Sequence, residues 1–373
     1  MLHVHQINLQ GIVGGGEIYT RSFTRALADA GARVSLYVNP ANRLWDGLAG
    51  ERIECIPVPD EAELQILLPA RAMVLTQGPL SRPTLGWLAR QHVLTGFAHM
   101  PMYQRSPDEF RAYRLVFSVS RYCIELLRRA GIEQAYPEPV YGAIDLARSD
   151  EPVVLRSPLI VDRKKPRDVL LGRLEKLVGV RGAGTPFAKA PGLTLGIVSL
   201  LSPIKQFPAL FSILAPALAR RPQVRLEIFG NGGYGQIRHL KRALAPLGAR
   251  ARFWGFQPNV AAIYPQLDYL MTGLPEKEAL GLNALEAQGC GTPVLAPAAP
   301  PFTETVVDGA SGFLYRDPRE DGGRHFEKIL DAILAGKPRP DPRVAAKAHL
   351  EQFTHAALVE RARRMLAALS GLE

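Results

Sequence analysis

The sequence predicts an α/β protein with two doubly wound domains that face each other across a cleft. Three observations support this fold class. Short apolar segments rich in β-branched residues alternate with segments of helical periodicity. Such alternation predicts a parallel sheet covered by helices on both faces. The alternation occurs twice, and 373 residues are enough for two domains of ordinary size.

The first half of the chain contains one set of alternating segments. Residues 3–9 are a predicted strand that ends at a glycine-rich loop, and residues 18–30 are a predicted helix with one apolar face. Further strands are expected at 32–38, 73–78, 92–99 and 115–120, followed by a helix at 120–131. Ser120 is a suitable cap for that helix and Gly131 a suitable end.

The second half repeats the pattern. Strands are expected at 193–200, 224–230, 251–255, 268–273 and 292–296, and helices at 207–221, 235–248 and 282–288. One long helix is expected at 343–369, after a proline-rich link. It is long enough for its end to cross back onto the first domain. Ligands of open α/β sheets bind outside the carboxyl ends of the strands, so site residues are sought there.

Composition restricts the class of protein further. Hydrophobic residues make up 47% and charged residues 21%, which is typical of globular proteins. The three cysteines lie far apart and show no metal-ligand spacing, which favours a reducing, cytoplasmic location. The N-terminus does not resemble a signal peptide. The longest apolar run, near 193–201, is about half the ~20 residues that a membrane-spanning helix needs.

Two glutamates, Glu278 and Glu286, enclose a glycine just after a predicted strand. Gly281 allows close approach of a ligand, and the helix that begins near Leu282 offers free N–H groups and a positive dipole end to an anion. The order carboxylate, anion site, carboxylate matches the sugar, diphosphate and ribose of a nucleotide-diphosphate sugar. On the spacing alone, two solvated surface acids are the favoured interpretation.

The surrounding residues resemble a known family. Glu278, Gly281, Leu282, Leu285, Glu286, Ala287, Cys290, Gly291, Pro293 and Val294 match the signature of the retaining glycosyltransferases of family 4 (glycosyl transferases group 1), which have the GT-B fold. Segments near 14–38, 117–131, 140–145, 229–233, 253–260 and 304–315 also match in order. The resemblance covers nearly the whole chain except about 149–191.

The resemblance implies a metal-independent hexosyltransferase. It would move a sugar, with retention, from a nucleotide-diphosphate sugar to a glycan, lipid-linked or small-molecule acceptor, as in cell-envelope polysaccharide synthesis. The first domain, 1–150, would hold the acceptor, and the second domain, 191–349, would hold the donor. No cofactor is expected, because Lys205, helix N-termini and backbone N–H groups would neutralise the diphosphate.

The resemblance also assigns individual residues. Gly14, Gly15 and Gly16 would contact the donor diphosphate through backbone N–H groups; a flexible turn is the plainer interpretation. His99 would contact the sugar hydroxyls, and otherwise is a structural histidine at a domain edge. Glu278 would orient the sugar, so His99 and Glu278 are the catalytic candidates. The donor-binding candidates are Gly14, Gly15, Gly16, Lys205, Gly281, Leu282 and Glu286.

The chain departs from the family at one important position. Leu200 stands where an arginine usually binds phosphate, and Gln206 stands where a glycine usually follows the lysine. Losing an arginine removes a planar, bidentate phosphate partner. This motivates a second hypothesis, a nucleotide-sugar-binding protein with little or no transfer activity. A third is a GT-B relative with different chemistry, such as an epimerase or a phosphorylase.

Most of the excess positive charge lies between the two domains. The net charge is +10, and residues 156–189 carry nine Lys and Arg against Asp162, Asp168 and Glu175. In this connector, 151–190, a helical stripe of Leu170, Leu174, Leu177 and Val178 could lie on an anionic membrane. An ordinary linker helix packed at a domain edge explains the pattern equally well. Nucleic acid is not expected, because the charge is not accompanied by a series of interleaved aromatic residues on which bases could stack. The final segment, 350–373, is grouped with the first domain.

Overall fold

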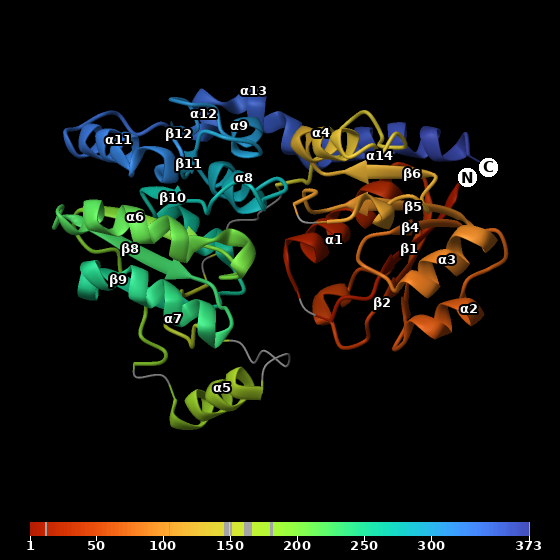
Figure 1. Cartoon of the computed structure of the whole chain (residues 1–373), viewed down its shortest axis with the longest axis horizontal. Coiled ribbons are helices and arrows are strands. Elements are labelled where there is room, and N and C mark those ends of the chain that lie inside the picture. The colour runs from red at the N-terminus through yellow and green to blue at the C-terminus, as the bar shows by residue number, and fades with distance from the viewer. Residues whose placement is uncertain are drawn as a thin grey trace. The chain divides into compact units, whose positions relative to one another are not determined.

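The structure is a computed structural model. It describes every residue except 12, 104, 145–148, 150, 160–165, 180–181 and 373, and also leaves out the side chain of Lys176. The chain divides into two compact units, Met1–Ile144 with Glu351–Glu373, and Asp145–Leu350. Each unit has its own six-stranded parallel sheet (Figure 1). The stretch 151–190, which the sequence sets apart as a connector, groups with the second unit.

The first unit contains a sheet with strand order β3-β2-β1-β4-β5-β6. Its strands are β1 (His3–Asn8), β2 (Arg33–Val38), β3 (Ile53–Pro57), β4 (Met73–Thr76), β5 (Val93–Ala98) and β6 (Leu115–Ser118). Its helices are α1 (Gly15–Asp29), α2 (Leu64–Leu67), α3 (Arg82–Gln91), α4 (Arg121–Arg129) and α14 (His355–Ser370). Apart from β3, these strands are buried over most of their length, as expected when helices cover both faces of a parallel sheet.

The second unit contains a sheet with strand order β12-β11-β10-β7-β8-β9. Its strands are β7 (Leu193–Val198), β8 (Val224–Phe229), β9 (Ala251–Gly255), β10 (Tyr269–Met271), β11 (Val294–Pro297) and β12 (Gly312–Tyr315). Its helices are α5 (Pro166–Val178), α6 (Phe207–Ala219), α7 (Tyr234–Ala243), α8 (Leu282–Gly289), α9 (Phe302–Thr305), α10 (Pro318–Asp321), α11 (Arg324–Leu334), α12 (Pro342–Ala345) and α13 (Lys347–Leu350). A large core of Leu, Ile and Phe side chains lies between this sheet and its helices.

Every strand that the sequence predicts is present, and two more complete the sheets. The additional strands, β3 and β12, are the outermost strands of their sheets. Edge strands are commonly short and weakly patterned, because one side of the strand has no neighbour to satisfy. Their sequences therefore give little periodic signal. Among the described residues, no helix combines the length and the apolar character needed to cross a membrane.

The predicted single helix over 343–369 is wrong. The structure breaks it into α12, α13, a short 3-10 turn at Glu351–Phe353 and α14. Thr354 begins α14 as its N-cap, since its hydroxyl oxygen accepts the Ala357 N–H at 3.2 Å. The break has a structural consequence: α12 and α13 pack on α8 in the second unit, whereas α14 packs on α1 in the first.

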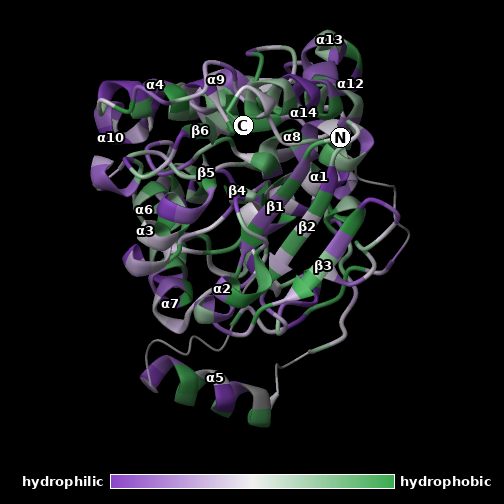
Figure 2. Ribbon diagram, turned by 90° about the vertical axis from the view of Figure 1, so that its right-hand side faces the viewer, coloured by the Kyte–Doolittle hydropathy of each residue, from purple (hydrophilic) through white to green (hydrophobic). Residues whose placement is uncertain are grey.

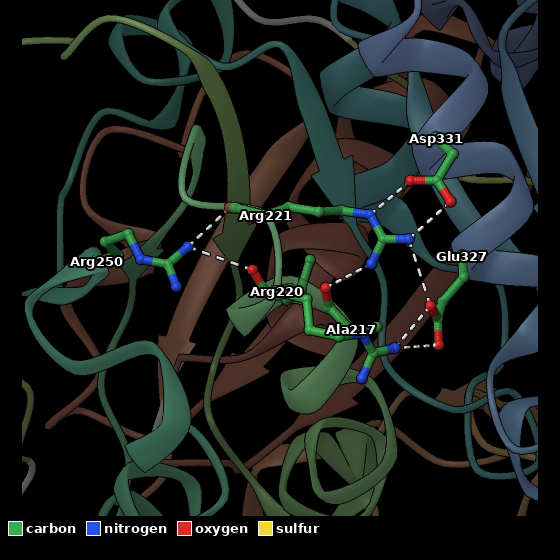
Figure 3. A network of polar contacts seen from close by, with 7 residues as sticks. Ala217, Arg220, Arg221, Arg250, Glu327 and Asp331 are labelled. Carbon is green, nitrogen blue, oxygen red and sulfur yellow. Dashed lines mark hydrogen bonds and ion pairs between the residues drawn. The ribbon is translucent and has the colours of Figure 1, made fainter.

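A network of arginines and acids fixes the amino-terminal edge of the second sheet (Figure 3). Arg221 binds Asp331 with Nε to Oδ1 at 2.6 Å, and Arg220 binds Glu327 at 2.7 Å. Arg250 donates to the carbonyl oxygen of Arg221 at 2.9 Å. Arg220 and Arg221 precede β8 and Arg250 precedes β9, so the network lies at the edge opposite the strand ends where ligands bind. We attribute a structural role to this charge cluster.

Candidate functional site

The strand order of the second sheet reverses between β7 and β10, and the candidate site begins there. Ligands of doubly wound sheets bind at the carboxyl edge beside such a switch point. Lys205 lies in the segment after β7 and Glu278 in the segment after β10, and the Lys205 ammonium forms an ion pair with Oε2 of Glu278. Their side chains are only 21% and 12% exposed, so water screens this pair less than a surface pair.

Glycine at position 273 allows these two segments to meet. A Cβ atom there would lie 2.0 Å from the carbonyl oxygen of Lys205, which no side chain could tolerate. The same carbonyl accepts the Leu274 N–H at 3.2 Å. The contact between the two backbones therefore places Lys205 within reach of Glu278.

The start of α8 provides the predicted anion site. Gly281 precedes the helix with φ 81°, a left-handed conformation that favours glycine, and has no side chain to cap it. Leu282 is the first helical residue. The Ala284 N–H already donates to the Gly281 carbonyl oxygen at 2.9 Å, so an anion at this helix start would be bound by the N–H groups of Leu282 and Asn283.

Glu286 lies one turn into α8 and has an unusual environment. Its Oε2 accepts a hydrogen bond from the buried Tyr264 hydroxyl at 2.9 Å. Burial raises the pKa of Glu286 to about 7, although the Tyr264 hydrogen bond and the charge of Lys205 act in the opposite direction. This carboxyl is therefore partly protonated at neutral pH. Sequence reasoning missed Tyr264, since nothing in the local pattern links it to α8.

The structure brings an arginine, Arg319, to the loop that carries Glu278. It binds Glu276 through two hydrogen bonds of 2.8 Å and also binds Asp317. Its guanidinium is therefore shared between two carboxylates, and it could bind phosphate only by exchanging them. Leu200, which takes the position of the expected arginine, is 38% exposed.

In the first unit, the strand order reverses between β1 and β4, and the glycine loop follows β1. Gly14 precedes α1, and its N–H donates to Oε2 of Glu17 at 2.9 Å. Burial raises the pKa of Glu17 above its usual range. A Cβ atom at Gly15 or Gly16 would meet nothing within 4 Å, so the space beside the start of α1 is open.

His99 follows β5, one strand further along. Its ring stacks on Phe97 at 5.3 Å between centroids and meets the edge of Tyr19 at 5.0 Å. Burial, with a smaller contribution from Arg105, lowers its pKa to about 4, so the imidazole is neutral at neutral pH. Its Nε2 lies 2.7 Å from Oε1 of Gln77, a buried residue after β4 that sequence reasoning also missed.

The predicted residues thus form two groups, one in each unit. The first contains Gly14–Gly16 and His99, and the second contains Lys205, Glu278, Gly281, Leu282 and Glu286. The predicted cleft between the domains, and the roles of these residues, stay predictions. Asp162 of the connector, and Asp145 at the end of the matching segment 140–145, lie outside the described residues. Among the described part of the chain, no group of three or more His, Cys, Asp or Glu side chains is placed to hold a metal ion.

Comparison with known proteins supports the resemblance. Residues 192–335 match the family glycosyl transferases group 1. A D-inositol 3-phosphate glycosyltransferase of Stackebrandtia nassauensis is 33% identical over 227 residues, which are 57% of this chain and 48% of that protein. The enzyme of the same name from Mycobacterium leprae is 30% identical over 174 residues, 44% of this chain and 39% of that protein. The chain thus spans about half the length, or less, of the curated relatives it matches.

Solved structures extend the similarity to the whole chain. Anabaena HepE in complex with UDP and glucose has a TM-score of 0.69 at 19% identity, over 99% of this chain and 100% of that one. Sucrose-phosphate synthase from Thermosynechococcus elongatus has a TM-score of 0.67 at 17% identity, over 100% of both chains. At these identities the likeness establishes the fold. Residues 192–335 are therefore similar to the glycosyl transferases group 1 family, and the chain as a whole has the two-domain GT-B fold.

Proposed function

We propose that the protein is a retaining glycosyltransferase that moves a sugar from a nucleotide-diphosphate donor to a hydroxyl of a glycan, lipid-linked or small-molecule acceptor. One observation carries the proposal: the Lys205–Glu278 ion pair lies at the switch point of the second sheet, followed along the chain by the open start of α8 and by Glu286. Lys205 and the α8 N–H groups would hold the diphosphate. Glu278 would orient the sugar and Glu286 the ribose.

The ion pair suggests how the donor enters. A diphosphate would compete with Glu278 for the Lys205 ammonium, and the freed carboxylate would accept hydrogen bonds from the sugar hydroxyls. When the bond between the anomeric carbon and the diphosphate breaks, negative charge grows on the leaving phosphate. Lys205 and the helix N-terminus then stabilise that charge, which is the main catalytic contribution asked of the protein. The leaving phosphate would accept the proton of the acceptor hydroxyl.

This arrangement neutralises the diphosphate with protein groups, so we propose that transfer needs no metal. UDP-glucose is the first donor to test, because HepE, which has the same fold, is described in complex with UDP and glucose. The cytoplasmic location and a role in cell-envelope polysaccharide synthesis are parts of the same proposal.

Calorimetry with UDP, GDP, ADP and dTDP and their glucose conjugates, in buffer containing EDTA, tests the proposal directly. We expect one nucleotide to bind the wild type and to bind Lys205→Ala at least tenfold more weakly, since a charge-assisted hydrogen bond contributes about 1.5–3 kcal/mol. Lys277→Ala, which changes the residue directly before Glu278, is the matched control and should bind normally. Binding that needs added Mg²⁺ would contradict metal independence.

Leu200 favours a second candidate function, a nucleotide-sugar-binding protein with little turnover. The two candidates differ in one measurement, the release of free nucleotide from a bound nucleotide sugar in the presence of mixed acceptors. Release with formation of a glycoside supports transfer and identifies the anomer. Tight binding without release supports the second candidate. An altered but unattached sugar would indicate an epimerase, and a sugar phosphate a phosphorylase.

We also propose that α5 lets the protein lie on an anionic membrane. Four apolar side chains of this helix are exposed, with Leu177 at 82% and Val178 at 86%. Figure 2 shows hydrophobic and hydrophilic residues alternating along it. Sedimentation with vesicles of phosphatidylglycerol, and with phosphatidylcholine alone as control, tests this. We expect binding only to the anionic vesicles, and its loss in a Leu174→Glu, Leu177→Glu variant.

A further inference from the structure

A pocket of about 610 Å³ lies at the carboxyl edge of the first sheet, and none of the predicted site residues lines it. Its walls include residues that follow β1, β2 and β3, such as Leu9, Asn39 and Asp60, and residues at the start of α3. This edge is where open parallel sheets bind ligands. The volume falls within the range of roughly 300–1,000 Å³ that small-molecule sites occupy.

Side-chain hydrogen bonds join the pocket to the glycine loop. The Asn39 amide donates to the carbonyl oxygen of Leu9 at 3.3 Å, and the Asn42 amide donates to that of Gln10 at 2.9 Å. Leu9 and Gln10 begin the loop that leads to Gly14. A ligand in the pocket would therefore rest against the base of the same loop that the proposed reaction uses.

The lining combines hydrogen-bonding groups with apolar surface. Asn39 and Gln65 contribute amides, and Ser81 and Thr84 contribute hydroxyls. Leucine and proline side chains, among them Pro83, provide apolar surface. Amides and hydroxyls can both donate and accept hydrogen bonds, as sugar hydroxyls do, while apolar side chains suit the C–H faces of a sugar ring.

The charge of the pocket excludes phosphate. Glu61 accepts the Ser81 N–H at 3.0 and 3.2 Å and the Thr84 hydroxyl at 2.6 Å, so a carboxylate already occupies the start of α3. Although burial opposes it, these hydrogen bonds hold the pKa of Glu61 below its usual value, and the group is ionised at neutral pH. Asp60 adds a second carboxylate. The ten lining residues include no Lys, Arg or His; Arg82, the chain neighbour of Ser81, is not one of them.

We propose that this pocket binds the acceptor, and that the acceptor is an uncharged polyol such as a neutral sugar rather than a phosphorylated one. The proposal rests on the proposed transfer function. It also separates this chain from the relatives named for D-inositol 3-phosphate, because two carboxylates without a cation repel a phosphate group.

Saturation-transfer NMR tests the proposal with myo-inositol, methyl α-glucoside and inositol monophosphate as probes, in the presence of UDP. Ala62, an exposed lining residue, is changed to tryptophan to fill the pocket. Ile66→Trp is the matched control, because Ile66 is 84% exposed close by in the chain and does not line the pocket. Gln65→Lys places a cation at the pocket wall.

We expect at least one neutral probe to bind the wild type and Ile66→Trp, and to bind Ala62→Trp at least tenfold more weakly. Inositol monophosphate should bind only Gln65→Lys. The proposal is overturned if the phosphate binds the wild type as well as a neutral probe does, if no neutral probe binds, or if Ala62→Trp binds normally. Calorimetry with UDP, GDP, ADP and dTDP on the same samples separates a failure of the pocket proposal from a failure of the proposed transfer function. Binding of one of these nucleotides leaves the transfer function standing, and binding of none of them removes it.

Discussion

At the scale of single residues, Glu286 makes nucleotide binding depend on pH. Its folded pKa of about 7 lies above the ordinary value of 4.5, so the folded protein holds an extra proton between these values. The contribution of Glu286 to the free energy of unfolding therefore falls as pH rises from about 4.5 to 7. Ribose hydroxyls bind the ionised carboxylate best, so nucleotide affinity should rise over the same interval.

Calorimetry with UDP from pH 5.5 to 8.5 checks this, with an expected gain of up to about tenfold per pH unit below the pKa. Glu286→Gln should remove the pH dependence. The Tyr264 hydroxyl lowers the pKa of Glu286. Tyr264→Phe removes this hydroxyl, so the rise in affinity should move to higher pH. A flat wild-type profile would mean that Glu286 does not touch the ribose.

Gln206 is a second residue with a defined conformational cost. It has φ 53°, a left-handed conformation in which a side chain is unfavourable, and it stands where the resembled family has glycine. We expect Gln206→Gly to raise the free energy of unfolding by about 0.5–1 kcal/mol in urea titrations. Arg71→Gly is the matched control, since Arg71 also has a left-handed conformation, with φ 54°, but belongs to the first unit whereas Lys205 belongs to the second. A Gln206→Gly variant less stable than wild type would show that the glutamine side chain compensates for its conformation.

At the scale of elements, the chain ends α13 and begins α14 within a few residues, and Thr354 makes this possible. Its hydroxyl accepts the Ala357 N–H and donates to the Glu351 carbonyl at 2.9 Å. Thr354→Ala should lower stability by about 1 kcal/mol, and Thr354→Ser should restore most of it. Chemical denaturation followed by circular dichroism measures both. Equal stability of the alanine variant and the wild type would contradict the capping role.

The same element shows where the sequence misleads. The periodicity of 343–369 predicts one helix, and most of these residues are indeed helical. Periodicity records only which face of a helix carries the apolar residues, and both halves of the segment have such a face. The break depends on each half burying that face in a different unit, which no local pattern records.

At the scale of the whole molecule, the chain divides into two compact units, so we expect a bound ligand to slow hydrogen exchange more in one unit than in the other. If the donor binds as proposed, UDP should slow hydrogen exchange at 203–206 and 274–286 in the second unit, and should leave α14 and β3 unchanged. At a hundredfold excess over the Kd, the added stability would be about 2.7 kcal/mol. Equal protection of both units would show instead that UDP binding involves the first unit as strongly.

The sequence by itself determined the α/β class, the two domains, ten of the twelve strands found among the described residues and the loops that carry the candidate residues. These follow from local properties: apolar period, turn residues and motif spacing. Only the tertiary structure decided which distant residues meet. Lys205 meets Glu278, Tyr264 meets Glu286, and Gln77 meets His99 because of strand order and close backbone approach at Gly273. Such contacts depend on the order in which parallel strands lie side by side. The local hydrophobic periodicity of a segment carries no information about that order.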